Sequence, residues 1–92
     1  MISLPVISMF YGIIISMYPF DNRKHHKSHI HVKFSGSECV IAIPEGDVLE
    51  GQIPSKQLKL VQAWIAIHED ELMADWELAI GGNRVFEISP LK

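Results

Sequence analysis

The sequence predicts an α+β domain in which a C-terminal helical segment covers one face of an antiparallel sheet of four or five strands. Up to residue 53 the apolar residues occur in short runs of β-formers separated by turn residues, whereas residues 54–80 follow a helical period. The 92 residues are 48% hydrophobic and 21% charged, which is enough for one core and a single domain over 1–92.

Residues 1–20 carry no charged side chain, and a stretch of that length can span a bilayer. Pro5, Gly12 and Pro19 interrupt it, and the β-branched residues between them favour a strand over a helix. The basic residues that open a signal peptide are missing from it. We therefore expect neither a membrane anchor nor a leader but a long central strand over Phe10–Tyr18, buried on both faces.

An exposed loop is expected over 19–28, where charged residues follow no period, and a strand over His29–Phe34 comes next. Ser35-Gly36-Ser37 is a turn sequence that joins this strand to a second one over Glu38–Ile43. The first strand alternates between a core face and a solvent face, formed by Ile30, Val32 and Phe34 and by His29, His31 and Lys33 respectively.

Two further strands complete the predicted sheet. A turn over 44–47 leads to a strand over Val48–Ile53, in which Gly51 predicts a bulge or a short edge strand. Near the C-terminus, Val85–Ile88 is predicted to be a short strand that joins the sheet or lies along the helices.

The helical segment starts at Pro54-Ser55 and ends at Gly81-Gly82. Because the acidic triplet Glu69–Glu71 is favourable in the first turn of a helix and unfavourable towards its end, we expect a break near His68, giving one kinked helix or two helices. The apolar side chains of the segment share one stripe, formed by Leu58, Val61, Trp64, Ile65, His68, Leu72, Trp76 and Ala79.

Charge and cysteine content exclude two classes of protein. The formal net charge of −3 gives no overall basic surface for nucleic acid, so any such binding has to be local. The single cysteine, Cys39, cannot form an internal disulfide, which excludes a small disulfide-stabilised secreted fold and favours a reducing compartment, the cytoplasm.

Four motifs occur in the order seen in a family of small bacterial proteins. They are Phe10–Ile13, His29–Val32, the pair Trp64 and His68, and Trp76–Ala79. In this order the chain resembles the family called domain of unknown function 4160. The chain departs from the family pattern at two places, since Lys27-Ser28 stands where two prolines are usual and Asp75 precedes the tryptophan where an asparagine is usual.

The resemblance implies that the chain has a partner protein, and it does not indicate a reaction. Genes of this family often lie beside a gene for a second small protein, and the pair is suggested to form a toxin–antitoxin-like module. No reaction is established for the family, so the resemblance leaves open whether the chain is an enzyme.

The histidines are the candidate metal ligands. His29 and His31 would project from the same side of a strand about 7 Å apart, and two such imidazoles can converge on one ion. With His68 as a third ligand they would form a zinc site with an open position. The structural alternative is that the two strand histidines are solvent-facing residues and that His68 is held by the dipole at a helix end.

The same residues suggest a metal-free ribonuclease. His29, His31, His68 and Lys33 could supply the acid, the base and a phosphate contact for general acid–base cleavage of RNA. A local basic patch for the RNA backbone would consist of Arg23, Lys24, Lys27 and Lys33. Cys39 lies in an apolar strand, which makes it a poor nucleophile.

The leading interpretation is a protein-interaction component. Trp64 and Trp76 lie on the apolar stripe, which in most such helices is core against a sheet, and the alternative is that they are partner anchors. Because the stripe is wide for one small sheet to cover, we expect part of it to meet another chain. The expected partner is a second copy in a homo-oligomer or the small protein encoded by the adjacent gene, with RNA as a further candidate and no membrane.

Overall fold

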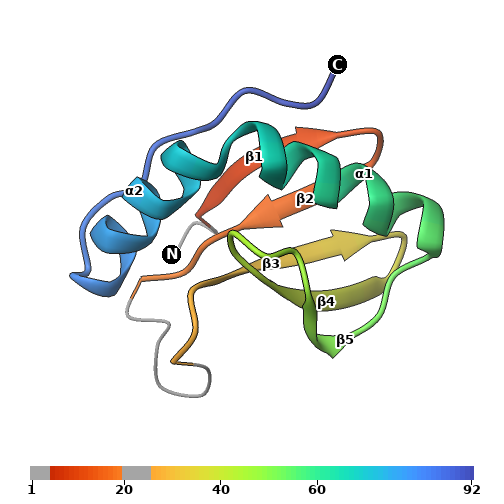
Figure 1. The fold of residues 1–92 in the computed structure, drawn as a ribbon, viewed down its shortest axis with the longest axis horizontal. Helices are drawn as coiled ribbons and strands as arrows, with labels where there is room; N and C mark the ends of the chain where they lie inside the picture. The colour runs from red at the N-terminus through yellow and green to blue at the C-terminus, as the bar shows by residue number, and fades with distance from the viewer. Residues whose placement is uncertain (1–4, 20–25) are drawn as a thin grey trace.

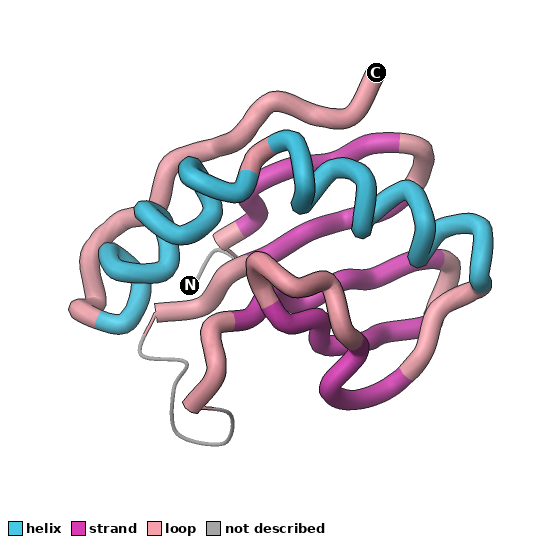
Figure 2. The backbone as a smooth tube through the Cα atoms, in the orientation of Figure 1, coloured by secondary structure: helices cyan, strands magenta, loops and turns pink. Residues whose placement is uncertain are grey.

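The computed structural model, described over residues 5–19 and 26–92, contains a five-stranded antiparallel sheet followed by two helices (Figure 1). The strands lie in the order β1-β2-β3-β4-β5. Both helices lie on the same side of this sheet (Figures 1 and 2), which confirms the predicted α+β class. The elements are β1 (Val6–Phe10), β2 (Ile13–Ser16), β3 (His29–Phe34), β4 (Ser37–Ala42), β5 (Val48–Gly51), α1 (Ser55–Ile67) and α2 (Glu69–Ile80).

The N-terminal apolar run is a hairpin, and the predicted single strand over Phe10–Tyr18 is wrong. Tyr11 and Gly12 have φ values of 50° and 79°, and two consecutive residues with positive φ form the tight turn that suits the twist of a hairpin. Phe10 therefore pairs with Ile13 across this turn. The strand signal extends through the turn because β-forming residues stand on both sides of it.

The β3–β4 hairpin agrees with the prediction. Its turn consists of Ser35 and Gly36, with φ values of 46° and 83°, and Lys33 pairs with Glu38 across it. The predicted bulge near Gly51 is also present, because the register between β4 and β5 shifts between Val40 and Ile41. Gly51 has a φ of +74°, and a Cβ atom added there would lie 2.3 Å from the carbonyl oxygen of Glu38.

The helical segment breaks at His68, as predicted. This residue has non-helical angles of φ −111° and ψ 28°, and it ends α1 and begins α2. Three acidic residues, Glu69, Asp70 and Glu71, occupy the first turn of α2, where the exposed N–H groups of the helix favour negative charge. The break therefore places the acidic triplet at the favourable end of a helix.

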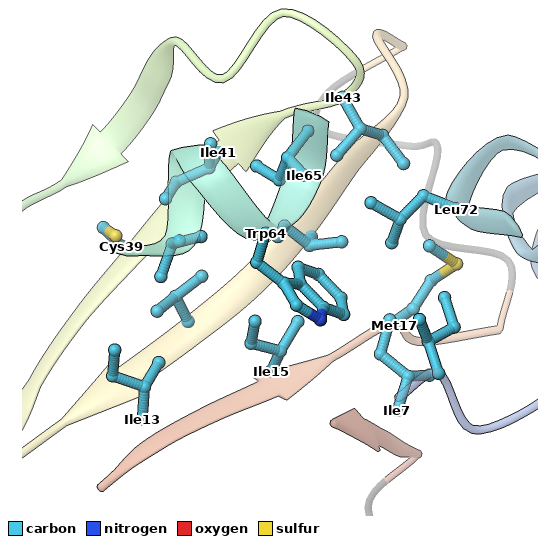
Figure 3. Close-up of a cluster of buried hydrophobic side chains, with 14 of the residues drawn as sticks. Ile7, Ile13, Ile15, Met17, Cys39, Ile41, Ile43, Trp64, Ile65 and Leu72 are labelled. Carbon is cyan, nitrogen blue, oxygen red and sulfur yellow. The ribbon is translucent and has the colours of Figure 1, made fainter. Parts of the chain in front are cut away.

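The core lies between the inner face of the sheet and the apolar stripe of the helices. Trp64 of α1 has no exposed surface and lies among side chains of the strands and both helices (Figure 3). Its ring centroid is 5.5 Å from that of Phe10, and its Nε1–H donates to the carbonyl oxygen of Ser89 at 2.8 Å. The other core residues around it include Ile7, Ile13, Ile15, Met17, Ile41, Ile43, Ile65 and Leu72.

The burial of the stripe corrects the expectation that Trp64 and Trp76 anchor a partner. Both tryptophans are buried within the folded chain, and the sheet and the C-terminal tail together cover them. Periodicity identified the apolar face of the helices, but it could not show that Ile88 and other tail residues would add to the surface that covers it.

The C-terminal tail is not the strand predicted over Val85–Ile88. It follows the helices and the edge of the sheet without regular structure (Figure 2). Three separate hydrogen bonds hold it: Phe86 N–H donates to Asp75, Ile88 N–H donates to the carbonyl of Ile7, and the Ser89 carbonyl accepts from Trp64. Because these partners belong to three different elements, the tail cannot form a continuous ladder with β1.

Neither helix of the described part of the chain is long and apolar enough to cross a membrane.

Candidate functional site

The face of the sheet opposite the helices is the candidate site, and we call it the uncovered face. Residues that pair directly across antiparallel strands project to the same side, so the register defines which side chains occupy it. One row consists of Met9, Ile14, Lys33 and Glu38. The adjacent row consists of Val6, Ser16, His31, Val40 and Glu50.

A pocket of about 330 Å³ lies on the uncovered face over β3, β4 and β5. His31 and Glu50 flank Val40 in one row, and the Lys33–Glu38 pair lies in the next. The lining residues are Tyr18, His31, Val32, Lys33, Glu38, Cys39, Val40, Glu50 and Gly51. The pocket therefore combines an apolar floor with aromatic and charged walls, which is the usual make-up of a binding site.

Two contacts organise the walls of this pocket. The ring of Tyr18 meets the ring of His31 edge-on, with centroids 4.7 Å apart. The ammonium of Lys33 lies 3.3 Å from Oε1 of Glu38. Glu50 is a second carboxylate among the described residues that line the pocket.

Apolar side chains are exposed at the β1–β2 hairpin, and the row that holds Met9 and Ile14 continues into Lys33 of the pocket. Met9 and Tyr11 are each 61% exposed, and Ile14, which pairs with Met9, is partly buried. Tyr11 occupies the first position of the hairpin turn with a φ of 50°. A bulky residue with positive φ is strained by about 1–2 kcal/mol. The conformation of the turn therefore does not explain why a tyrosine occupies this position.

His29 is buried, which corrects the expectation that it faces solvent. Only 1% of its surface is exposed, and its ring lies 5.0 Å from that of Trp76 and 5.3 Å from that of His31. Its Nδ1 is 2.8 Å from the carbonyl oxygen of Lys27, a distance at which an Nδ1–H donates to that oxygen. Strand alternation predicted a solvent-facing His29, but Trp76 of α2 contacts its ring at this end of the strand.

His68 does not join the strand histidines. It lies at the junction of α1 and α2, where its ring is 5.5 Å from that of Trp64 and its Nδ1 is 2.6 Å from Glu71. Within residues 5–19 and 26–92, no three His, Cys, Asp or Glu side chains are grouped so that they could hold a metal ion. The predicted zinc set is therefore not assembled among these residues, and of the four predicted acid–base residues the pocket lining contains His31 and Lys33.

The predicted basic patch is divided. Arg23 and Lys24 lie outside the described residues. Lys27 forms an ion pair of 2.6 Å with Glu45, and Lys33 forms one with Glu38. The hydrogen bond from Lys27 lowers the pKa of the Glu45 carboxyl. Both described lysines therefore have a carboxylate beside them, which weakens their attraction for a phosphate backbone.

Cys39 is a residue of the core. Burial raises the pKa of its thiol to about 11, so the reactive thiolate is scarce at neutral pH. This agrees with the expectation that it is a poor nucleophile.

A family model matches residues 12–77, and that family is described as Domain of unknown function (DUF4160). This match covers more than half of the chain. The chain belongs to the DUF4160 family. No curated protein and no solved structure matches it. The matched region contains His31, Lys33, Glu38 and Glu50 of the pocket, whereas Tyr11 lies just before it.

The pocket residues of this DUF4160 chain that were not among the predicted site residues include Tyr18, Glu38 and Glu50. The position of Glu38 could have been predicted from the sequence, because a two-residue turn over 35–36 places it directly opposite Lys33. No local sequence pattern predicts the position of Glu50, since its pairing with Val40 depends on the shifted register between β4 and β5.

Asp75, where the family resemblance implies an asparagine, is a buried carboxyl with 2% of its surface exposed. Its Oδ1 accepts the N–H of Phe86 at 2.9 Å, and its Oδ2 has no hydrogen-bond partner among the residues that the structure describes. Burial raises the pKa of Asp75, the Phe86 N–H opposes part of this rise, and the charge of Glu71 adds to it.

We expect Asp75 to make the fold less stable as the pH rises. A carboxyl whose pKa is higher in the folded state holds more protons there, so the free energy of unfolding decreases from the unfolded pKa, about 3.9, up to the raised folded value. Asp75→Asn keeps an oxygen for Phe86 and removes the charge, so urea titrations should find the stability advantage of this variant increasing with pH over that window. A difference that is constant from acid to neutral pH would contradict the prediction.

Proposed function

We propose that this DUF4160 chain is the protein-binding component of a two-gene toxin–antitoxin-like module, and that the uncovered face receives its partner. The partner is the small protein encoded by the adjacent gene, which is the arrangement that the family resemblance implies. We place the module in the cytoplasm, in keeping with the single unpaired Cys39.

The observation that carries this proposal is Tyr11. The first position of such a hairpin turn favours asparagine, aspartate or glycine, because these residues adopt positive φ at low cost. Tyrosine is strained there, and with 61% of its surface exposed its ring gains little from burial in the folded chain. A strained and exposed aromatic side chain is typical of a residue whose contribution comes from contact with another molecule.

The surroundings of Tyr11 support the same conclusion. Met9 is equally exposed, and tyrosine and methionine are enriched at protein interfaces. The pocket supplies charged groups on the same face, so a partner would meet an apolar patch beside a polar site. The helical stripe, in contrast, has no tryptophan available for a partner.

Tyr11→Asn is the test. Asparagine suits the turn, so we expect the free energy of unfolding to stay level or to increase by about 1 kcal/mol. When the tagged chain is co-expressed with the neighbouring gene product, we expect the amount of partner that co-purifies to fall at least about tenfold, as for loss of an interface anchor.

The matched control is Ile67→Asn. Ile67 is 65% exposed, but it belongs to α1 on the other side of the sheet. Its replacement should leave the capture of the partner unchanged. Equal capture by the Tyr11→Asn variant and the unmodified chain would overturn the proposal, and so would a homodimer, measured by light scattering, that the partner cannot displace.

Acid–base cleavage of RNA is a second candidate function, and one observation favours it. His31 and Lys33, both predicted for this chemistry, line the same pocket as the hydroxyl-bearing Tyr18. The Lys33–Glu38 ion pair opposes it, because Glu38 already offsets the ammonium that a phosphate would need. RNA cleavage by the purified chain that His31→Gln lowers at least about 100-fold would favour this function over the first.

A further inference from the structure

We infer that the partner adds an extended segment to the outer edge of β1, in the place that the C-terminal tail (residues 83–92) holds in the free chain. This inference rests on the proposed function, and it names the kind of segment that the partner supplies. It follows from the outward-facing backbone groups of β1, from the way in which the tail contacts them, and from the buried polar atoms at the points where the tail is attached.

β1 is an edge strand, because it has a neighbouring strand, β2, on one side only. Phe10 and Ile13 close the two-residue turn and therefore exchange both of their backbone hydrogen bonds. Bonded and unbonded pairs alternate, so the N–H and C=O of Met9, in the next pair, point away from β2. Among the described residues, none outside the sheet bonds to these two groups. The Met9 backbone therefore offers a donor and an acceptor to another strand.

This edge lacks most of the features that prevent strand addition. Natural edge strands carry charges, prolines or bulges, or are covered by other parts of the chain. The strand Val6–Phe10 contains no charged residue and no proline, and the register shift between Val6 and Ser8 is its one irregularity. A strand added here would lie beside the exposed Met9 and the hairpin turn, so its contact would be continuous with the partner site proposed above.

The tail shows which chemistry suits the edge. It runs beside β1 (Figure 1), where the N–H of Ile88 donates to the carbonyl oxygen of Ile7 at 2.7 Å. The side chain of Ile88 is 4% exposed and belongs to the core. Among the described contacts, this carbonyl is the one backbone group of β1 that bonds to the tail. A partner segment that carries an aliphatic side chain and pairs with both Ile7 and Met9 would form more backbone hydrogen bonds than the tail does.

Two buried polar atoms weaken the attachment of the tail. Asp75, whose Oδ1 accepts from Phe86, has no partner for its Oδ2 among the described residues, and Ser8, which follows Ile7, has none for its Oγ. A buried polar atom without a hydrogen bond destabilises the state that buries it. Release of the tail at these two points would let water reach both atoms. The tail is therefore suited to exchange with a segment of the partner.

Hydrogen exchange of the full chain, alone and in complex with the neighbouring gene product, tests the inference without any substitution. We expect the Met9 amide to exchange at least about 100-fold more slowly in the complex, because it gains an acceptor there. The Ile88 amide should exchange at least about tenfold faster, because it loses the carbonyl of Ile7. Val32 is the internal control, since it pairs with strands on both sides and its amide should not change.

Met9→Pro and Met9→Ala separate the backbone of Met9 from its side chain. Both remove the methionine side chain, but only proline removes the N–H, and an outward-facing position on an edge strand is where proline is tolerated. We expect Met9→Pro to weaken partner binding, measured by titration calorimetry, at least about tenfold more than Met9→Ala does. Equal losses would mean that only the side chain meets the partner and would overturn the inference. The exchange measurement decides the question if the proline variant does not fold.

Ile88→Ala tests whether the tail competes with the partner. It weakens the docking of the tail and should strengthen partner binding about three- to tenfold, because more of the chain is then ready to bind. Ile65→Ala is the matched control, since it removes the same side chain from the core at a position in α1. It should not strengthen binding. A gain in both variants, or in neither, would overturn the displacement of the tail.

The outcomes separate this inference from the proposed function. Partner binding in which the Met9 and Ile88 amides keep their exchange rates would overturn the inference and leave the proposed function standing. The expected exchange changes, together with full capture by Tyr11→Asn, would support the inference and overturn Tyr11 as the anchor. Slow exchange of the Met9 amide in the chain alone would mean that a second copy pairs with β1, and would overturn the assignment to the partner. Failure of the unmodified chain to capture the gene product would overturn both.

Discussion

Replacement of Gly51 by alanine is expected to lower the free energy of unfolding by about 2–5 kcal/mol. The methyl group would lie 2.3 Å from the carbonyl oxygen of Glu38 and 3.0 Å from Cα of Cys39, and both atoms belong to the backbone of the neighbouring strand. Backbone atoms of a paired strand cannot move aside as the end of a flexible side chain can. The positive φ of +74° adds the ordinary strain of an L-residue in this conformation.

Gly36→Ala is the matched control for this substitution. Gly36 has a similar φ of +83° in the β3–β4 turn, but a Cβ atom there would meet nothing within 4 Å. Its replacement should therefore cost only the backbone strain, about 1–2 kcal/mol. Urea titrations of the two variants measure the free energy of unfolding of each. The difference between the two losses gives the cost of the steric clash at residue 51. Equal losses of stability would show that β5 can withdraw from β4 at little cost.

Trp64→Ala is expected to lower the free energy of unfolding by about 3–5 kcal/mol. The indole has no exposed surface and lies at the centre of the core, between the sheet and both helices (Figure 3). Its removal would leave a cavity that the surrounding side chains of several elements could not all close. It would also leave the carbonyl of Ser89 without the hydrogen bond that it accepts from Nε1.

Two further variants separate the contributions of Trp64. Trp64→Phe retains a ring against Phe10 and loses the hydrogen bond to the tail. It should therefore lower the free energy of unfolding clearly less than Trp64→Ala does. Ile67→Ala, in the same helix but exposed, should change stability by no more than about 0.5 kcal/mol. A loss below about 1 kcal/mol for Trp64→Ala would mean that this side chain does not hold the two layers together.

Much of the fold was predictable because its signals are local. The alternation over His29–Phe34 identified β3 with its observed bounds, and the spacing of apolar residues identified the helical stripe. The break at His68 could be predicted because the acidic triplet after it favours the first turn of a helix and disfavours a later one. Each of these signals lies within a few neighbouring residues.

The predictions failed where a single residue indicated a turn, or where the outcome depended on contacts between residues far apart in the sequence. Tyr11 is not a usual turn residue, so Gly12 alone marked the turn, and the hairpin was interpreted as one long strand. The contact of part of the stripe with another chain was predicted from the width of the stripe, without the surface that the tail contributes. The burial of His29 depends on Trp76, which lies far along the chain.

The sequence by itself determined the class of the fold, the turn at Ser35-Gly36, the division of the helical segment and the family. The tertiary structure alone decided which polar residues share a site. Strand alternation placed His31 and Lys33 on one side of β3, but Glu50 reaches their pocket only through the bulged register of β4 and β5, and Tyr18 only through the hairpin that precedes it. Periodicity depends on residues a few positions apart, whereas a pocket depends on pairing between segments whose register no local pattern specifies.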